Sequence, residues 1–170
     1  TTSPRPVGGV LAAAQQAHDL KGLKLGVPRE YFIAELAPEL AQLTRAAIDQ
    51  CAALGAEIVE VSLPHVSASL PCYAVLGSAE ASASLARYDG MRYGLRVDAP
   101  ELMEMYDRTR AAGFGDEVKR RLLFGTLVLT SRYHADFYLR AQKVRTLIQQ
   151  DFLQAFTAYD ALLGPITLTP

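Results

Sequence analysis

Apolar residues in the first third of the chain follow first a strand pattern and then a helix pattern. Residues 23–27 form a short apolar run that Pro28 stops, as at the end of a strand. Pro38 suits the first turn of a following helix. Apolar side chains then recur at helical spacing and form one stripe, which consists of Leu40, Leu43, Ala47, Cys51 and Leu54. These patterns predict a strand followed by an amphipathic helix.

A second strand pattern comes directly after this helix. Gly55 suits the left-handed conformation that often ends a helix. Residues 57–61 then alternate polar and apolar side chains, as a half-buried strand does, and Pro64 closes the run. Strand, helix and strand of these lengths predict a βαβ unit with two parallel strands and a right-handed crossover.

The rest of the chain is mainly helical in pattern. Helices are expected over residues 69–85, 101–112, 116–130 and 135–155, with a turn at residues 87–90. Residues 122–129 are apolar almost all round, so the helix over 116–130 should be buried on most sides. Residues 160–165 are typical of a final strand that leads into a loop.

Together these elements predict an α/β fold with a few short strands, one βαβ unit and a majority of helix. Residues 1–19 are expected to form a linker with a short helix over 10–18, and residues 20–170 to form the folded portion. Three strands are few for a free-standing doubly wound sheet. We therefore expect sequence outside this chain to complete the sheet.

Composition narrows the classes of function. The chain has 170 residues, 50% of them apolar and 21% charged, which is typical of a folded domain and not of a disordered segment. The formal net charge of −1 lacks the basic excess of most nucleic-acid binders. Cys51 and Cys72 form no metal or redox motif, so we expect reduced thiols in a cytoplasmic protein. No apolar run is long enough to cross a bilayer, and no membrane partner is expected.

Common catalytic motifs are missing from the sequence. It contains no G-x-S-x-G elbow, no phosphate-binding loop, no dinucleotide fingerprint and no H-E-x-x-H pair. Ser78, Ser82 and Ser84 lie within a predicted helix, where their expected role is packing or hydrogen bonding back to the helix backbone. The sequence therefore predicts no catalytic residue, no metal ligand and no bound cofactor in this chain.

Arg120 and Arg121 stand near the start of the helix expected over 116–130. Asp116 precedes Arg120 by four residues and Glu117 precedes Arg121 by four, so both arginines could form exposed ion pairs along the helix. Successive helix residues point about 100° apart, so one guanidinium can instead face inward. An inward guanidinium is rarely unpaired, and a ligand carboxylate is a natural bidentate partner. Both interpretations stay open on the residues alone.

Small residues dominate the helix expected over 69–85. Tyr73, Gly77, Glu80 and Ser84 share one face of this helix, where small side chains would let another backbone or a ligand approach closely. A tightly packed helix with a satisfied Tyr73 hydroxyl is the alternative interpretation.

Five stretches of the chain recur in the same order in a known family. They are residues 20–32 (LKGLKLGVPREYF), residues 80–94 with EAS and LARYDGMRYG, residues 113–121 (GFGDEVKRR), residues 142–148 (QKVRTLI) and the pair Gly164-Pro165. With these residues the chain resembles the C-terminal portion of amidase-signature proteins. Within that family it is most similar to the A subunits of tRNA-dependent amidotransferases. The resemblance covers roughly residues 20–170.

The resemblance implies a partial amidase-signature fold, and an activity and partners for the whole protein. The A subunits that the chain resembles hydrolyse glutamine to ammonia through a Ser–cis-Ser–Lys triad. That triad lies in a Gly/Ser-rich segment upstream of the matched part, so we expect this chain to be inactive alone. Ammonia passes to the B subunit, which uses ATP and magnesium to amidate Glu-tRNA(Gln) or Asp-tRNA(Asn), and the C subunit wraps around the other two. Glutamine and the B and C subunits are the implied partners, and direct tRNA contact by this portion is not expected.

The same resemblance assigns two substrate-binding residues. Arg121 corresponds to a clamp for the α-carboxylate of glutamine, with Arg120 as the alternative if the register shifts by one residue. Tyr73 corresponds to a tyrosine near the substrate. Residues 74–77 depart from a more aromatic stretch of the family, which changes the detailed shape of the pocket. The competing interpretations are another amidase-signature amide hydrolase and a non-catalytic assembly module.

Overall fold

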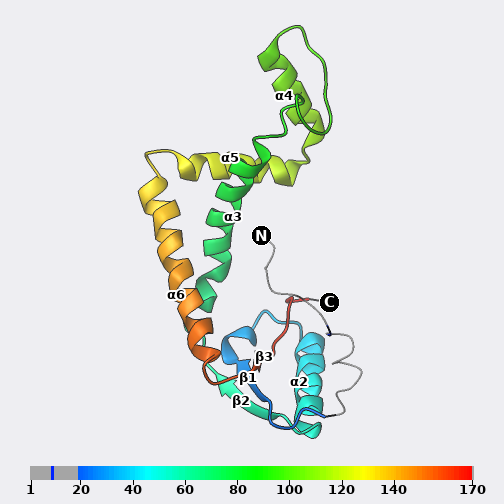
Figure 1. Cartoon of the computed structure of the whole chain (residues 1–170), viewed down its shortest axis with the longest axis vertical. Coiled ribbons are helices and arrows are strands. Elements are labelled where there is room, and N and C mark those ends of the chain that lie inside the picture. Colours follow the sequence, from blue (N-terminus) through cyan, green and yellow to red (C-terminus); the bar gives the residue numbers. More distant parts are fainter. Residues whose placement is uncertain (1–8, 10–18, 170) are drawn as a thin grey trace. The chain divides into compact units, whose positions relative to one another are not determined.

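The computed structural model describes Gly9 and residues 19–169, so the predicted linker and short helix lie outside the described residues apart from Gly9 and Asp19. Contacts group the chain into two units, Thr1–Pro64 with Asp151–Pro170 and His65–Gln150. The first unit carries a sheet and the second carries most of the helices (Figure 1). The α/β class with predominant helix is confirmed.

Parallel strands form the sheet of the first unit. β1 spans Lys24–Pro28, β2 spans Glu57–Val61 and β3 spans Ala161–Leu162, in the spatial order β2-β1-β3. Leu25 of β1 pairs with Ile58 of β2 on one side and with Ala161 of β3 on the other. Helix α2, Pro38–Ala53, connects β1 to β2 (Figure 1), so the predicted βαβ unit with parallel strands is confirmed.

The covered side of α2 differs from the predicted stripe. Leu40, Ile48 and Cys51 are half-buried, whereas Leu43 is 68% exposed. Within the described residues α2 contacts chiefly β2, so one row of apolar side chains is covered and the neighbouring row with Leu43 is not. The helix ends as predicted, because Gly55 adopts a φ of 100° just after it.

The carboxylate of Glu30 ties together the carboxyl ends of β1 and β2. Its two oxygens accept hydrogen bonds from the Ser62 hydroxyl at 2.5 Å and from the Leu63 N–H at 3.0 Å. Arg29 donates to the same carboxylate at 3.2 Å and to Ser62 Oγ at 3.0 Å. Burial raises the pKa of the Glu30 carboxyl, but these donors outweigh burial and hold the pKa at about 2 instead of 4.5.

Asp160 aligns the starts of β1 and β3. A side-chain oxygen of Asp160 accepts a hydrogen bond from the Lys24 N–H at 2.8 Å, and the Asp160 N–H donates to the Lys24 carbonyl at 2.8 Å. Further along the two strands, the Leu163 N–H donates to the Gly26 carbonyl at 2.9 Å. These bonds fix the register of a strand that is only two residues long.

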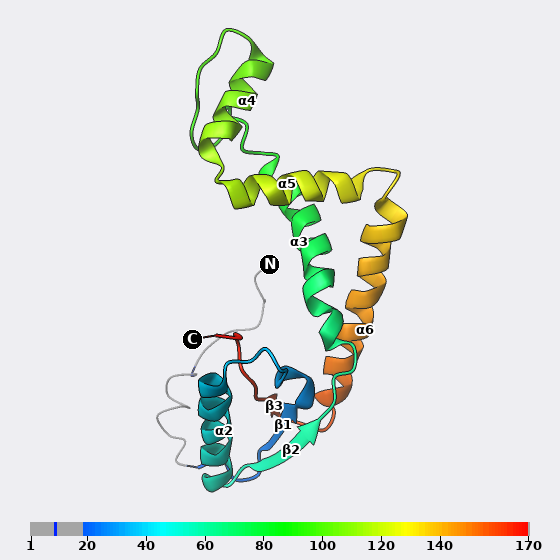
Figure 2. The ribbon, with the colours of Figure 1, turned by 180° about the vertical axis from the view of Figure 1, so that it is seen from behind.

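The helices of the second unit are α3 (Ser69–Leu85), α4 (Leu102–Gly113), α5 (Asp116–Leu129) and most of α6 (Arg140–Ala155). α3 and α6 lie side by side in both views (Figures 1 and 2), where Cys72 and Leu76 pack against Ala141. The Cys72 thiol donates to the Ala141 carbonyl at 3.3 Å. The helix predicted over 135–155 starts with a π-helical turn, His134–Leu139, before α6.

Helices α3 and α5 cross in close contact at Gly125. A Cβ atom on Gly125 would lie 2.0 Å from the Ser78 carbonyl oxygen and 2.8 Å from Ser82 Cβ, so only glycine permits this approach. Beside the crossing, the hydroxyls of Ser82 and Thr126 form a hydrogen bond at 3.0 Å. Ser78 is thus buried at the crossing, with 7% of its surface exposed, and Ser82 packs beside it, as the packing interpretation predicts.

The prediction that α5 is buried on most sides is wrong in the described structure. Val128 is 1% exposed, but Leu123 is 75% exposed and Leu127 is 47% exposed. Among the described elements α5 packs mainly on α3, so one side of the helix is covered and its other leucines face outward.

Replacing Glu30 by glutamine should lower the free energy of unfolding by about 1–2 kcal/mol at pH 7, because the charged acceptor of three donors is lost. The pKa of Glu30 is depressed in the folded state. Its contribution is therefore complete above pH 4.5 and is lost as the pH falls towards 2. Urea unfolding of both proteins between pH 7 and pH 2 measures these effects. Glu60→Gln, at an exposed position of β2, is the control. Equal stability of E30Q and the wild type would show that the hydrogen bonds of Glu30 do not stabilise the sheet.

Replacing Gly125 by alanine should destabilise the second unit by about 2–3 kcal/mol, because the added methyl group collides with the backbone of α3. Thermal unfolding followed by circular dichroism measures the loss. Gly115→Ala is a matched control, because a Cβ atom there meets nothing within 4 Å and the φ of −68° suits alanine. A G125A protein as stable as G115A would show that the helices do not cross this closely.

Candidate functional site

The two residues predicted to bind substrate lie together in the structure. Tyr73 is in the first turns of α3 and Arg121 is in the second turn of α5. Arg121 Nη1 donates a hydrogen bond to the Tyr73 hydroxyl oxygen at 3.1 Å. The guanidinium carbon also lies 6.0 Å from the centre of the Tyr73 ring. Residues 48 positions apart in sequence thus form one polar contact.

Glu117 holds both arginines of this region. Its Oε1 accepts a hydrogen bond from Arg121 Nε at 3.0 Å, and its Oε2 accepts one from Arg120 Nη1. The Arg121 bond and the neighbouring guanidinium charges lower the pKa of the Glu117 carboxyl. Hydrogen bonds to Glu117 and then to Tyr73 raise the pKa of the Arg121 guanidinium. The predicted pair Asp116–Arg120 is not formed, because Arg120 bonds to Glu117 and Asp116 lies 4.0 Å from Lys119.

These side chains line an open pocket of about 450 Å³ between α3 and α5. Arg121 is the less exposed of the two arginines, with 44% of its side chain accessible against 74% for Arg120. Neither guanidinium is buried, but Arg121 is the arginine that contacts Tyr73. The pocket is lined by Leu70, Tyr73, Ala74, Gly77, Ser78, Glu117, Arg120, Arg121 and Phe124.

Two hydrogen-bond donors of this pocket remain available to a ligand. Arg121 uses Nε for Glu117 and Nη1 for Tyr73, while Nη2 donates to no acceptor among the described residues. A tyrosine hydroxyl that accepts from a guanidinium still has its own proton to donate. Arg121 Nη2 and the Tyr73 hydroxyl can therefore both donate to one anionic oxygen pair, such as a carboxylate.

Gly77 gives the Tyr73 ring the room that this contact needs. A Cβ atom on Gly77 would lie 3.0 Å from Tyr73 Cε2 and 3.4 Å from Cζ. The ring therefore lies along α3 over the bare glycine, one turn further on. The prediction that these two residues share one helix face is confirmed.

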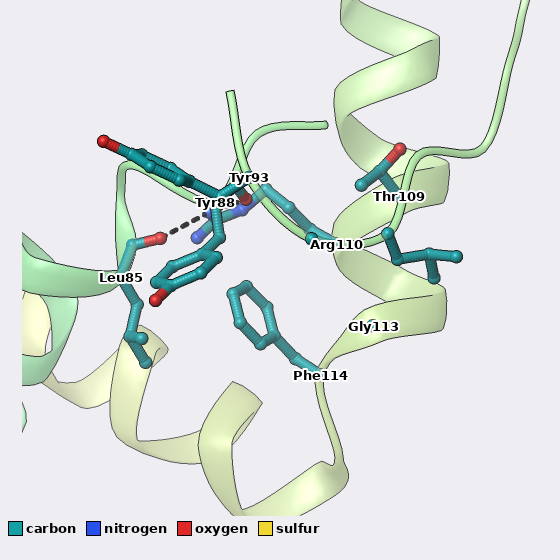
Figure 3. Close-up of a pocket in the computed structure, with 9 residues that line it drawn as sticks. Leu85, Tyr88, Tyr93, Thr109, Arg110, Gly113 and Phe114 are labelled. Atoms are coloured by element: carbon teal, nitrogen blue, oxygen red, sulfur yellow. Dashed lines mark hydrogen bonds between the residues drawn. The ribbon is translucent and has the colours of Figure 1, made fainter. Parts of the chain in front are cut away.

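A second pocket, of about 290 Å³, lies beside the end of α3 and is lined by aromatic rings (Figure 3). Tyr88, Tyr93 and Phe114 surround Arg110, the charged member of the residues that line it. Arg110 Nη1 donates to the carbonyls of Leu85 and Tyr88 at 3.1 Å each. Through Nη1 this arginine therefore satisfies carbonyls at the C-terminal end of α3 and holds that end of the helix.

A larger hollow of about 730 Å³ lies on another face of α5 and is lined by leucines, threonines, Ala111 and Phe114, with Arg110 and Lys119 as its charged members. Binding pockets usually combine apolar walls with a few polar groups that converge on one point. The pocket with Tyr73 and Arg121 has such an arrangement, because a guanidinium and a tyrosine hydroxyl meet there at 3.1 Å beside apolar walls.

Other chemistry is not brought together in the described residues. No group of three or more His, Cys, Asp or Glu side chains there could hold a metal ion. Cys51 and Cys72 are both free thiols. No helix in the described part of the chain is long and apolar enough to span a membrane.

Sequence reasoning missed two features of this site. Helical spacing permits the pair Glu117–Arg121, but it permits Arg120 to pair with either Asp116 or Glu117, so the bridge from Glu117 to both arginines was missed. The Arg110 cap on α3 joins residues 22 and 25 positions apart, and no local pattern indicates it.

Comparison with known proteins relates the whole chain to one family. The family model described as Amidase matches residues 1–170. Curated relatives include the A subunit of the glutamyl-tRNA(Gln) amidotransferase of Bartonella bacilliformis, which is 52% identical over 152 residues. The protein of the same name from Rhizobium johnstonii is 51% identical over 168 residues. These matches cover 89% and 98% of this chain but 31% and 34% of the relatives, so the chain spans about a third of their length.

Solved structures agree with this relationship. The A subunit of the glutamyl-tRNA(Gln) amidotransferase of Thermotoga maritima matches with a TM-score of 0.59 and 26% identity, over 89% of this chain and 28% of that chain. A bacterial aryl acylamidase of the amidase-signature enzymes matches with a TM-score of 0.59 over 93% of this chain and 31% of that chain. Its identity of 15% shows a shared fold alone.

Replacing Gly77 by alanine should displace the Tyr73 ring while leaving the fold intact. The added methyl group crowds the ring by a few tenths of an ångström, and the better helix propensity of alanine, about 1 kcal/mol, offsets the crowding. Nuclear Overhauser contacts between the Tyr73 ring and Arg121 should weaken. Gly113→Ala, where a Cβ atom meets only Leu95 at 3.8 Å, should leave these contacts unchanged. Undiminished contacts in G77A would show that Gly77 does not position the ring.

Proposed function

This chain belongs to the amidase family, and we propose that its α3–α5 pocket holds the α-carboxylate of glutamine in the A subunit of a glutamyl-tRNA(Gln) amidotransferase. The observation that carries the proposal is the bond between Arg121 and Tyr73, which leaves two donors free beside one another. The identity of 51–52% with A subunits of this enzyme supports the choice of activity.

The chemistry of a carboxylate fits this pair. A guanidinium keeps its charge at every physiological pH and offers donors in a planar fork that matches two carboxylate oxygens. The Tyr73 hydroxyl adds a neutral donor whose position is set by Gly77 and Arg121. Binding the carboxylate end of glutamine fixes one end of the substrate, so that its side-chain amide can be held at a reactive group elsewhere.

The groups that break the amide bond belong, in this proposal, to a Ser–cis-Ser–Lys triad outside the present residues. This chain contributes substrate recognition and scaffold, and it is inactive alone. The released ammonia serves a B subunit that uses ATP and magnesium, with a C subunit bound to both. We propose a cytoplasmic location for this assembly and no direct contact between this portion and tRNA.

Two other functions are weaker alternatives. A different amidase-signature hydrolase would act on an amide without a free carboxylate and would have no use for the paired donors of Arg121 and Tyr73. A purely structural module would not need an open polar pocket at all.

Replacing Arg121 by alanine should weaken glutamine binding about 10- to 100-fold, because charge-assisted hydrogen bonds of about 1.5–3 kcal/mol are lost. Binding is measured by NMR titration of the 170-residue chain with glutamine. Turnover is measured in a chimera in which this chain replaces the matching third of the Bartonella bacilliformis protein. Glutamine hydrolysis should fall in the R121A chimera, while hydrolysis of an uncharged amide should persist.

The neighbouring arginine provides the matched control. Arg120→Ala removes the same charge from the more exposed position, so glutamine affinity should change less than about threefold. A large loss in R120A with little change in R121A would move the clamp by one residue. Unchanged glutamine affinity in both variants would reject the proposed pocket.

A further inference from the structure

A carboxylate of the protein itself stands beside the proposed carboxylate pocket. Both oxygens of Glu117 are engaged, one by Arg121 Nε at 3.0 Å and the other by Arg120 Nη1. The Glu117 side chain is 58% exposed, so burial does not require this arrangement. Its position at the second residue of α5 suits the helix dipole, but Asp116 at the first residue suits the dipole equally well. The dipole therefore does not explain why Glu117 bonds to two guanidinium groups.

The Glu117 contact uses one of the two edges by which Arg121 could bind a carboxylate. A guanidinium can offer Nε with one Nη group, or its two Nη groups together. Nε is bonded to Glu117, so the first edge is occupied. Nη1 bonds to the Tyr73 hydroxyl with one of its two hydrogens, and Nη2 has no acceptor among the described residues. The edge through Nε is therefore closed, and Nη2 is the guanidinium nitrogen that remains open to a ligand beside the Tyr73 hydroxyl.

Glu117 also sets the charge of the pocket. The two guanidinium groups and the one carboxylate leave a net charge of +1 at neutral pH. One ligand carboxylate neutralises that charge. A second carboxylate on the same ligand would leave the pocket and ligand together with a net charge of −1, which is unfavourable while Glu117 is charged.

We propose that Glu117 is the specificity-determining residue of this pocket. It confines Arg121 to one binding edge and makes the pocket accept a ligand with one carboxylate while disfavouring a second. This inference rests on the proposed function, in which the ligand is glutamine. Glutamine has one carboxylate, and glutamate, the product of hydrolysing its side-chain amide, has two. Glu117 thus favours the substrate over the product and promotes product release.

The test compares glutamine with glutamate as probes for the 170-residue chain and its variants. Glu117→Gln keeps an oxygen acceptor for Arg121 but removes the charge. We expect glutamate to bind about three- to tenfold more tightly in E117Q than in the wild type at low salt, with glutamine changed less than about threefold. Asp116→Asn removes the same charge one residue away, where the side chain is 95% exposed, and should leave the ratio of the two affinities unchanged. An affinity ratio in E117Q equal to that of the wild type would overturn the proposal.

A second measurement reports the occupied edge without any ligand. In the wild type, the Arg121 Nε–H signal in the NMR spectrum should exchange slowly with water, because the proton is bonded to Glu117. Glu117→Ala should accelerate this exchange at least about fivefold, because the acceptor is lost, while Asp116→Asn should not. Equal exchange in E117A and the wild type would show that Glu117 does not hold the guanidinium.

The failure of the proposed function has a different signature. In that case wild-type spectra would not respond to glutamine. Acetate, with one carboxylate, then replaces glutamine as a probe, and glutarate, with two, replaces glutamate. The wild type should prefer acetate over glutarate, and E117Q should lose this preference. If D116N also lost this preference, the effect would come from the net charge of the protein and not from Glu117, which would overturn the proposal.

Discussion

The close crossing of α3 and α5 at Gly125 is the constraint on which the second unit depends. Tyr73 lies five residues before Ser78 on α3, and Arg121 lies four residues before Gly125 on α5. At 1.5 Å per residue, both side chains stand about 6–8 Å back from the crossing point. A larger helix separation would draw Tyr73 and Arg121 apart and weaken the 3.1 Å bond between them, because hydrogen bonds weaken with distance. The polar pocket with Tyr73 and Arg121 therefore depends on the lack of a side chain at Gly125.

Most element boundaries could be predicted from the sequence because local chemistry sets them. Both ends of α3 and of β2 lie where the pattern predicted them. Gly55, which follows α2, has the left-handed backbone conformation that the pattern predicted for the end of this helix. Burial was harder to predict. The leucines of α5 suggested that the helix is buried on most sides. A hydrophobic pattern shows which side chains prefer burial, but it does not show how many neighbouring elements are present to bury them. The exposed Leu43 of α2 has the same explanation.

The site was predicted unevenly, for reasons that differ from residue to residue. The pair Glu117–Arg121 follows from helical spacing, and the structure forms it. The choice of Glu117 over Asp116 by Arg120 could not be predicted, since spacings of three and of four residues both permit an ion pair. The approach of Tyr73 to Arg121 depends on the crossing of two helices, which no local pattern encodes. Only the resemblance to a family of known proteins pointed to both residues at once.

The last strand has a consequence for the order in which the chain acquires its structure. Leu25 pairs with Ala161, and the intervening chain contains the whole of the second unit. Closing a loop of that length costs conformational entropy, which falls if the intervening helices have already become compact. During synthesis β1 and β2 leave the ribosome long before β3. Until then, the edge of β1 that pairs with β3 lacks this partner. The pairing of β3, aligned by Asp160 on Lys24, is thus a late, high-contact-order event that completes the first unit only after the second exists.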